Sequence, residues 1–352
     1  MACAALTFAA HDLAAATLPP GFIDTTVASG LTDLTLMQIA PDGRVFVCQQ
    51  NGTVRVIRRN VLLPAPFLQI QNISTEGERG LMSLAFDPDY AHNRYVYVFY
   101  IRASPLTTVV GRVRASASNP NVAEGQPRVI FSIPHRGNLV LNGGGMEVGA
   151  DGKLYIGVGD NESGSGQNLS DPWGKVLRLN LPDGSIPRDN PFFRTTAGAN
   201  RAIWALGFHN PFTMAINTRT GRIHVNDTGD SGETSREEVD HLRRGVNYGW
   251  PDTQGPRSFF NYSAQAEGGF AIVGGDFYTP RVCMFPARYQ GQYFFADVGG
   301  WIRFINGDHR PGPLMPFADG IDIPTDVEVH PDGSLYYTAR GSGTVQRVTF
   351  AH

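Results

Sequence analysis

The chain has 352 residues, of which 41% are hydrophobic and 17% are charged, with a formal net charge of −3 and a pI near 6.3. A chain of this length can bury a large core, and a slightly acidic protein lacks the basic face that a nucleic-acid partner requires. No apolar run approaches the roughly 18 residues that cross a bilayer, so we expect no membrane span.

The first 18 residues, MACAALTFAAHDLAAATL, are rich in Ala but have no basic start and are interrupted by His11 and Asp12. We interpret residues 1–18 as the remnant of a secretion signal or as a cloning junction, and expect residues 19–352 to form one domain. Three cysteines, Cys3, Cys48 and Cys283, allow at most one disulfide, and the sequence does not say which pair would form it.

One pattern recurs along the chain: an alternating strand, a polar turn often written Pro-Asp-Gly, and a second alternating strand. Strict alternation around such a turn is a strong hairpin signal. The complete units lie at residues 37–48, 84–100, 146–159, 214–227 and 327–340, and a turn with its second strand lies at 287–297. Third strands are expected at 52–57, 174–180 and 343–350. Six units predict an all-β fold, a six-bladed β-propeller, with a two-sheet sandwich as the alternative.

Helical signal is almost absent. Only SREEVDHLRRG, residues 235–245, is expected to form a helical turn or two, unless its charges simply solvate a surface excursion. Several connections are too long to be simple turns, and in a propeller such loops gather at the channel and carry function. We therefore expect long functional loops on one face, at residues 74–81, 157–180, 204–212 and 226–251.

Specific motifs occur in combination from Pro20 to the C-terminus. They are ERGL at 78–81, GKVLRLN at 174–180, DNPF at 189–192, Asn210-Pro211 and NYGWP at 247–251. Together they resemble the soluble quinoprotein sugar dehydrogenases, the glucose/sorbosone dehydrogenase family. The resemblance implies a six-bladed propeller that holds pyrroloquinoline quinone (PQQ) with Ca²⁺ over the channel mouth and oxidises a sugar hydroxyl or hemiacetal. It also implies a small-molecule or carbohydrate substrate and a secreted or periplasmic location.

The resemblance also shows a substitution at the chemical centre. The family has a His in His-Asn-Gly-Gly that acts as general base, whereas this chain has Leu141 before Asn142, and leucine cannot accept a proton. The family's Arg before Asn-Pro is replaced by His209, which is followed by the matching Asn210. The resemblance therefore places the catalytic positions at His209, Asp160 and Asn142, and the cofactor contacts at Glu78, Leu141, His209 and Asn210.

Each surviving residue also has a structural interpretation. Asp160 either supports the base or bonds the backbone of its own turn. Glu78 either contacts the cofactor or pairs with Arg79. His209 is either a channel-facing base or metal ligand, or a hydrogen-bonded structural histidine.

Two further groups complete the expected site. The resemblance places Ca²⁺ on backbone carbonyls at Gly229 and Asp230, although such a segment is equally typical of a solvated turn. Asn247, Tyr248 and Trp250 form either a sugar platform or a packed blade edge. The family's Lys and Arg contacts to the cofactor carboxylates are missing, because none lies near Val298 or within 323–326. A tricarboxylate would thereby lose charge-assisted bonds of about 1.5 to 3 kcal/mol each.

Two function classes follow. The first is an oxidoreductase of the PQQ-dependent sugar dehydrogenase type, in which His209 or Asp160 replaces the lost imidazole. The second is a propeller without redox chemistry, either a Ca²⁺-dependent hydrolase or lyase or a carbohydrate-binding protein. The chain has no Gly-x-Ser-x-Gly, His-Glu-x-x-His or Cys-x-x-Cys motif, so serine hydrolysis and common zinc sites lack support.

Overall fold

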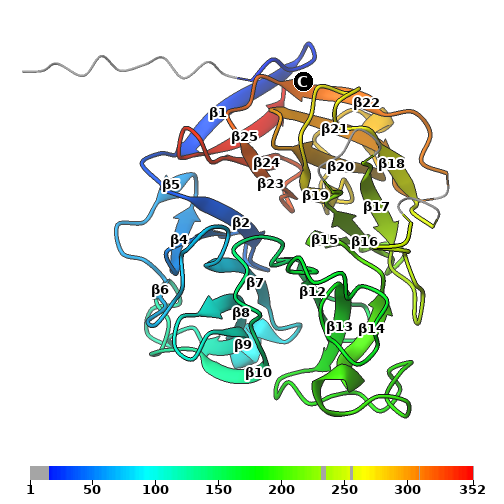
Figure 1. Cartoon of the computed structure of the whole chain (residues 1–352). Coiled ribbons are helices and arrows are strands. Elements are labelled where there is room, and N and C mark those ends of the chain that lie inside the picture. The colour runs from blue at the N-terminus through cyan, green and yellow to red at the C-terminus, as the bar shows by residue number, and fades with distance from the viewer. Residues whose placement is uncertain (1–15, 231–234, 254–256, 309, 352) are drawn as a thin grey trace, which may run out of the picture.

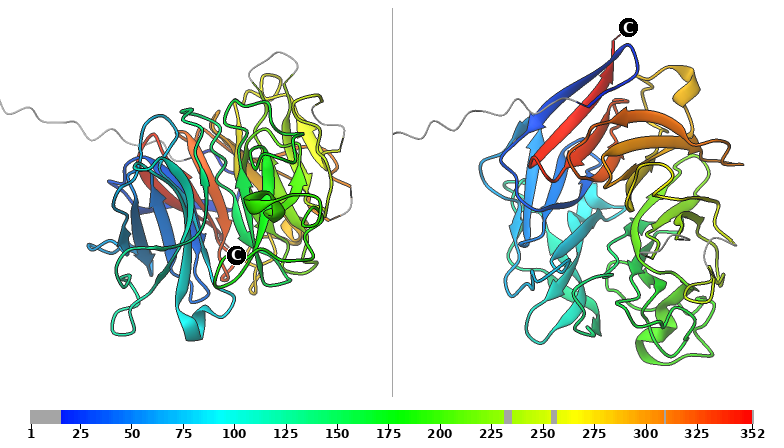
Figure 2. Two further views of the ribbon diagram at one scale, coloured as in Figure 1. Left: turned by 60° about the horizontal axis from the view of Figure 1, so that its bottom comes forward. Right: turned by 45° about the horizontal axis from the view of Figure 1, so that its top comes forward.

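The computed structural model describes residues 16–230, 235–253, 257–308 and 310–351, and nearly all of its regular structure is β-strand. Six antiparallel sheets are arranged in a ring (Figure 1), and we call the line along the axis of this ring the channel. Seen from other directions, the connecting loops lie toward the two ends of the ring (Figure 2). The predicted all-β, six-bladed β-propeller is confirmed.

Each blade begins with the strand nearest the channel. Blade 1 comprises β2 (Leu34–Ile39), β3 (Val45–Gln49), β4 (Thr53–Arg58), β5 (Val61–Leu62) and β6 (Leu68–Gln69). Blade 2 comprises β7 (Leu81–Phe86), β8 (Tyr95–Arg102), β9 (Thr107–Arg114) and β10 (Arg128–Pro134). Blade 3 comprises β11 (Met146–Val148), β12 (Lys153–Val158), β13 (Lys175–Asn180) and β14 (Ile203–Leu206). Short helical pieces connect some strands: α1 (Tyr90–Asn93), η1 (Gly198–Ala202) and η2 (Ala287–Tyr289).

The other three blades repeat this plan. Blade 4 comprises β15 (Pro211–Ile216), β16 (Ile223–Asp227), β17 (Glu237–His241) and β18 (Phe260–Tyr262). Blade 5 comprises β19 (Ile272–Phe277), β20 (Gln292–Asp297), β21 (Trp301–Asn306) and β22 (Met315–Asp319). Blade 6 comprises β23 (Pro324–Val329), β24 (Leu335–Ala339), β25 (Thr344–Phe350) and β1 (Phe22–Ala28).

The repeated turns form where the sequence predicts them, because they combine a carboxylate with a glycine. In blade 3 the Asp151 carboxylate accepts a bond from the backbone N–H of Lys153 (3.1 Å), and Gly152 takes a φ of +69°. Gly333 has a φ of +89° in the matching turn of blade 6. Only glycine adopts such angles at little cost, so the hairpin is specified locally.

The ring is closed by its N-terminal strand. β1 pairs with β25 from Phe22↔Phe350 onward, so the last blade combines both ends of the domain. Thr17 also forms a bridge with Asp319 of blade 5, and Ala16 and Leu18 pack against the core. Residues 16–18 therefore lie against the propeller, although we expected the domain to begin at residue 19. The interpretation of residues 1–15 lies outside the described residues.

The helical expectation for residues 235–245 is wrong, because this segment contains β17. Successive side chains of a strand alternate between its two faces, and here both faces are covered by neighbouring blades. The Glu237 carboxylate, for example, accepts a bond from the backbone N–H of Ile272 in the next blade (2.9 Å). The acidic residues of the segment are therefore buried and do not solvate a surface.

Cys48 is buried and Cys283 is exposed, and both are free thiols. Cys3 lies outside the described residues. Among the helices that the structure describes, none is long and apolar enough to cross a membrane.

Close packing of the inner strands gives a first prediction. A Cβ atom at Gly274 in β19 would lie 2.1 Å from the Cα atom of Asp326 in β23. Backbone atoms cannot move aside like a flexible side chain, so Gly274→Ala is expected to lower the free energy of unfolding by about 3 kcal/mol in urea denaturation. Gly30→Ala is the control, because Gly30 has open space and a φ of +71°; it should cost only about 1 kcal/mol. Equal effects would contradict the packing argument.

Candidate active site

The expected site residues come from loops at one end of the channel. The loops before the inner strands and the loops between second and third strands share this end, because neighbouring strands are antiparallel. Leu141 and Asn142 precede β11, His209 and Asn210 precede β15, and Asp160 follows β12. We call this end the mouth.

Backbone hydrogen bonds bring these loops together. The N–H of Asn161 donates to the carbonyl of Leu141 (3.0 Å), and the N–H of Asp160 donates to the carbonyl of His209 (2.7 Å). The Asn210 side chain accepts a bond from the N–H of Gly143 (2.9 Å). The end of β12 therefore lies between the segments that contain Leu141 and His209.

Leu141 has a φ of +55°, a left-handed conformation that is uncommon for leucine. Its N–H donates to the Glu78 carboxylate (3.1 Å), and burial raises the pKa of Glu78. Arg79 pairs with Glu76 instead of Glu78. Glu78 thus holds the segment that contains Leu141, and the pairing with Arg79 that we considered is not formed.

Asn142 is fully buried and faces His135. The N–H of Gly137 donates to His135 Nδ1 (2.9 Å), so the proton of the neutral ring is on Nε2 and donates to Asn142 Oδ1 (2.8 Å). Burial lowers the pKa of His135, which keeps the ring neutral. In this structure the Asn142 amide anchors the loop at the mouth.

Asp160 accepts four hydrogen bonds. Three come from the turn that follows it, from Ser163 Oγ, the N–H of Gly164 and the N–H of Ser165 (2.7–3.0 Å). The fourth comes from the indole N–H of Trp250 (3.1 Å). The structure therefore shows the turn interpretation of Asp160, together with a contact to an aromatic residue of another loop.

The imidazole of His209 at the mouth can accept a proton. Its Nδ1 lies 2.6 Å from the carbonyl of Thr228, and because a carbonyl only accepts, Nδ1 carries the proton and Nε2 carries the lone pair. Burial lowers the pKa of His209, so the ring is neutral near pH 7. The indole of Trp250 packs on it, with ring centroids 4.2 Å apart. This arrangement suits a proton acceptor.

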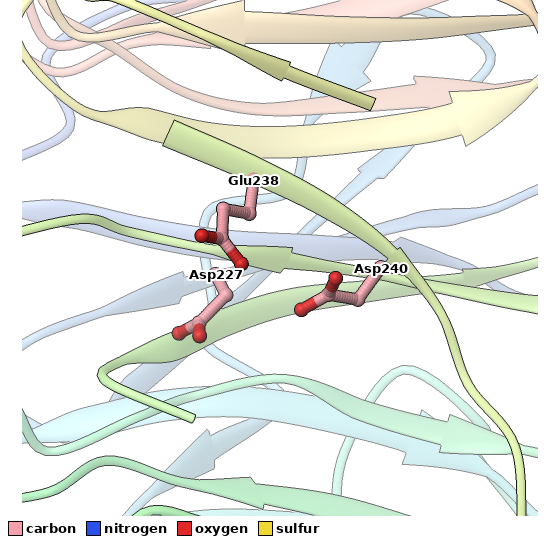
Figure 3. A group of neighbouring side chains, drawn as sticks. All are labelled: Asp227, Glu238 and Asp240. Atoms are coloured by element: carbon pink, nitrogen blue, oxygen red, sulfur yellow. The ribbon is translucent and has the colours of Figure 1, made fainter. Parts of the chain in front are cut away.

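A cluster of three carboxylates lies beside His209. Figure 3 shows the three side chains. Asp227 at the end of β16 faces Glu238 and Asp240 on β17, all three are buried, and one ligand oxygen of each lies within 4.8 Å of the others. Both Asp240 oxygens lack a hydrogen-bond partner among the described residues. Burial raises the pKa of Asp227 and of Asp240 well above the ordinary range. Such a cluster holds either protons or a cation.

The cluster is connected directly to the mouth. The Asp227 carboxylate accepts the backbone N–H groups of His209 (3.0 Å) and Asn210 (2.6 Å). Sequence reasoning missed the cluster because residues 235–245 were interpreted as a helix. A Glu-x-Asp alternation opposite an Asp on a neighbouring strand was the available signal. The Ca²⁺ assignment to Gly229 and Asp230 stays a prediction; here the N–H of Gly229 bonds Glu237 (3.2 Å).

Asn247 and Tyr248 pack the blade edge. Tyr248 is buried and its hydroxyl donates to the carbonyl of His241 (2.5 Å), while Asn247 bonds the side chain of Gln167 (3.0 Å). Of the three expected platform residues, Trp250 packs its ring on His209.

The residues that stand where the family has its basic contacts are acidic or apolar in this chain. Asp326 bonds the N–H of Met37 (2.7 Å), and Ile323 is 45% exposed. A basic residue that sequence reasoning missed is Arg340, whose guanidinium donates to Asp33 and Gln50 (3.1 and 2.9 Å). Burial raises the pKa of Glu78, and the charge of Arg340 partly offsets that rise. Its position directly after β24 was the available signal, because loops after second strands reach the mouth.

The fold and the loop-built mouth define a propeller whose site lies at one end of its channel. The chain belongs to the Glucose / Sorbosone dehydrogenase family, whose model matches residues 32–275. This confirms the family resemblance that the sequence motifs indicated.

Three known proteins show the range of similarity. The aldose sugar dehydrogenase YliI of Escherichia coli (strain K12) is 27% identical over 332 residues, which is 88% of each chain. Human Hedgehog-interacting protein is 30% identical over 310 residues, which is 78% of this chain and 42% of that protein. The PQQ-bound aldose sugar dehydrogenase of Streptomyces coelicolor has the same fold, with a TM-score of 0.78, 21% identity, and coverage of 95% of this chain and 99% of that one.

Proposed function

We propose that the protein is an oxidoreductase of the sugar dehydrogenase type. A carbohydrate hydroxyl or hemiacetal at the mouth gives its proton to His209, and the hydride from its carbon passes to an electron acceptor of the quinone class. The observation that carries the proposal is the bond from His209 Nδ1 to the Thr228 carbonyl (2.6 Å), because it leaves the Nε2 lone pair available. Family membership supports the reaction class. We also propose a secreted or periplasmic location, as the resemblance implies.

The side chains at the mouth do not fit PQQ in the family's arrangement. A tricarboxylate needs several cationic partners, but Val298 and Ile323 occupy two of the family's contact regions, and the Arg340 guanidinium already bonds Asp33. Glu78 adds a carboxyl group to the same end. We therefore assign no step of the reaction to PQQ.

The cluster of Asp227, Glu238 and Asp240 does fit Ca²⁺. Two ligand oxygens on opposite sides of the ion are separated by about 4.8 Å when each Ca–O distance is about 2.4 Å, and the cluster meets that limit. The oxygens of Asp240 have no other partner among the described residues, so an ion would satisfy them. Through Asp227, a bound Ca²⁺ would fix the backbone of His209 and Asn210. We propose this Ca²⁺ site in addition to the predicted carbonyl ligands at Gly229 and Asp230.

Titration calorimetry of the metal-stripped protein tests the cofactor and the ion together. Ca²⁺ alone is expected to bind. Asp240→Asn is expected to weaken the affinity for Ca²⁺ at least tenfold, because the variant removes a charged ligand. PQQ is then titrated with and without Ca²⁺. Calcium-dependent binding of PQQ at micromolar affinity or better would support the oxidoreductase and contradict the poor fit inferred from charge.

A second function is favoured by Leu141 and by the acidic mouth. This candidate is a propeller without redox chemistry, a carbohydrate-binding protein or a Ca²⁺-dependent hydrolase or lyase. Absence of PQQ binding in both conditions, with sugar binding retained, would favour it over the dehydrogenase.

A further inference from the structure

A cavity lies at the end of the ring opposite the mouth, between blades 1 and 2. Its volume is about 480 Å³, which falls within the range of about 300 to 1,000 Å³ for small-ligand sites. Turns from three places form its wall: the β2–β3 turn, the β4–β5 turn and the loop between β9 and β10. The side chains that carry the argument are Arg44, Arg58, Arg59, Asp42, Asn119 and Asn121.

Arg44 builds the wall between the two blades. It is buried, its guanidinium forms an ion pair with Asp42 (2.8 Å), and it donates to the carbonyl of Pro120 (2.6 Å) and the side chain of Asn121 (2.9 Å). The charge of Asp42, which is the acidic residue in the lining, is therefore compensated by Arg44. The positive charges of Arg58 and Arg59 remain in the lining, and that of Arg58 also attracts the Asp42 carboxylate.

Arg58 and Arg59 line the cavity with exposed side chains, and neither side chain has an ion pair or hydrogen bond within the described part of the chain. Arg59 and Asn60 form a tight turn with φ values of +52° and +62°, where Asn and Gly are the usual residues. The Asn60 side chain accepts a bond from the hydroxyl of Tyr336 in blade 6 (3.0 Å), which fixes the turn. Two adjacent guanidinium groups are thus carried on an anchored support.

We propose that this cavity binds the phosphate group of a small phosphate monoester through Arg58 and Arg59. The planar guanidinium fork matches phosphate oxygens, and two such groups suit a dianion. The positive lining is a local feature, because the chain as a whole has a net charge of −3. The Asn119 amide lies in the same cavity, where its NH2 group can donate to a hydroxyl group of the ligand, whereas the Asn121 amide bonds Arg44 and Asn119.

Calorimetry tests the site with inorganic phosphate, glucose 6-phosphate and glucose on the full chain. Phosphate and glucose 6-phosphate are both expected to bind. Arg58→Gln and Arg59→Asn are each expected to weaken the affinity for both ligands at least tenfold. Arg59→Asn should keep the melting temperature, because Asn adopts a positive φ more readily than Arg. Arg194→Gln, at an exposed position of the segment between β13 and η1, is the matched control and should leave both affinities unchanged.

Two results would overturn the proposal. One is absence of binding by both phosphate and glucose 6-phosphate. The other is binding that survives both substitutions, since the anion would then lie elsewhere. Neither measurement involves turnover at the mouth, so the outcome is independent of the proposed dehydrogenase function.

Discussion

The free energy of unfolding is expected to fall as the pH rises from about 5 to about 8. The reason is a group of carboxyl side chains on inner strands, Glu147, Asp276 and Glu328, which line a cavity of about 320 Å³ at the end of the channel away from the mouth. Burial raises the pKa of Glu147 to about 8 and that of Asp276 to about 7, and it raises the pKa of Glu328 well above its ordinary value. The charge of Asp276 also disfavours the ionisation of Glu147 and of Glu328.

The sign follows from proton binding. Unfolded carboxyl groups have pKa values near 4, so between pH 4 and pH 8 the folded protein binds more protons than the unfolded chain. Stability then decreases with pH, by up to about 1.4 kcal/mol per pH unit for each carboxyl group, and for Glu147 and Asp276 the decrease ends above about pH 8. Water in the open cavity reduces the effect, so we expect a total loss of about 4 kcal/mol between pH 5 and pH 8.5.

Urea denaturation at fixed pH values measures this loss. Glu147→Gln and Glu328→Gln should each flatten the dependence on pH, because an amide does not ionise. Glu124→Gln, at an exposed position, is the control and should leave the slope unchanged. A stability that is level or rises from pH 5 to pH 8.5 would show that these carboxyl groups are not protonated in the folded protein.

His209→Ala is expected to lower sugar oxidation at least 100-fold, because a positioned general base contributes about 10² to 10⁴ in rate. Dye reduction with an aldose, in the presence of Ca²⁺ and added quinone, is the measurement. The backbone N–H of His209 still bonds Asp227 in the variant, so the fold should be kept. His92→Ala, in an exposed part of α1, is the matched control. Unchanged turnover would remove His209 from the mechanism.

Leu141→His separates the loss of the base from the loss of the cofactor. Residue 141 has a left-handed backbone conformation, which His adopts more readily than an apolar residue. The substitution should therefore be tolerated, and turnover should rise if the base alone was lost. We expect this gain to persist in the His209→Ala background, because an imidazole at position 141 would replace the base.

The sequence alone determined the architecture. Asp-Gly turns such as Asp151-Gly152 and the alternating strands beside them are local signals, so the blades could be counted without knowing what packs on them. The loops at the mouth followed from the same count, because antiparallel strands place every loop of one kind at one end. Motifs such as ERGL at 78–81 and NYGWP at 247–251 added the family.

The tertiary structure decided the contacts that depend on distant neighbours. β17 is a strand whose acidic side chains are buried, and the backbone N–H of Ile272 donates to the Glu237 carboxylate, whereas its charges alone suggested a helical turn or a solvated excursion. Asp160 points to Trp250, 90 residues away, and Arg340 reaches the mouth from the last blade. Ring closure by β1 likewise needs a partner at the other end of the chain. Short-range patterns specify hairpins, but burial and pairing of charges are set by residues that only the closed ring brings together.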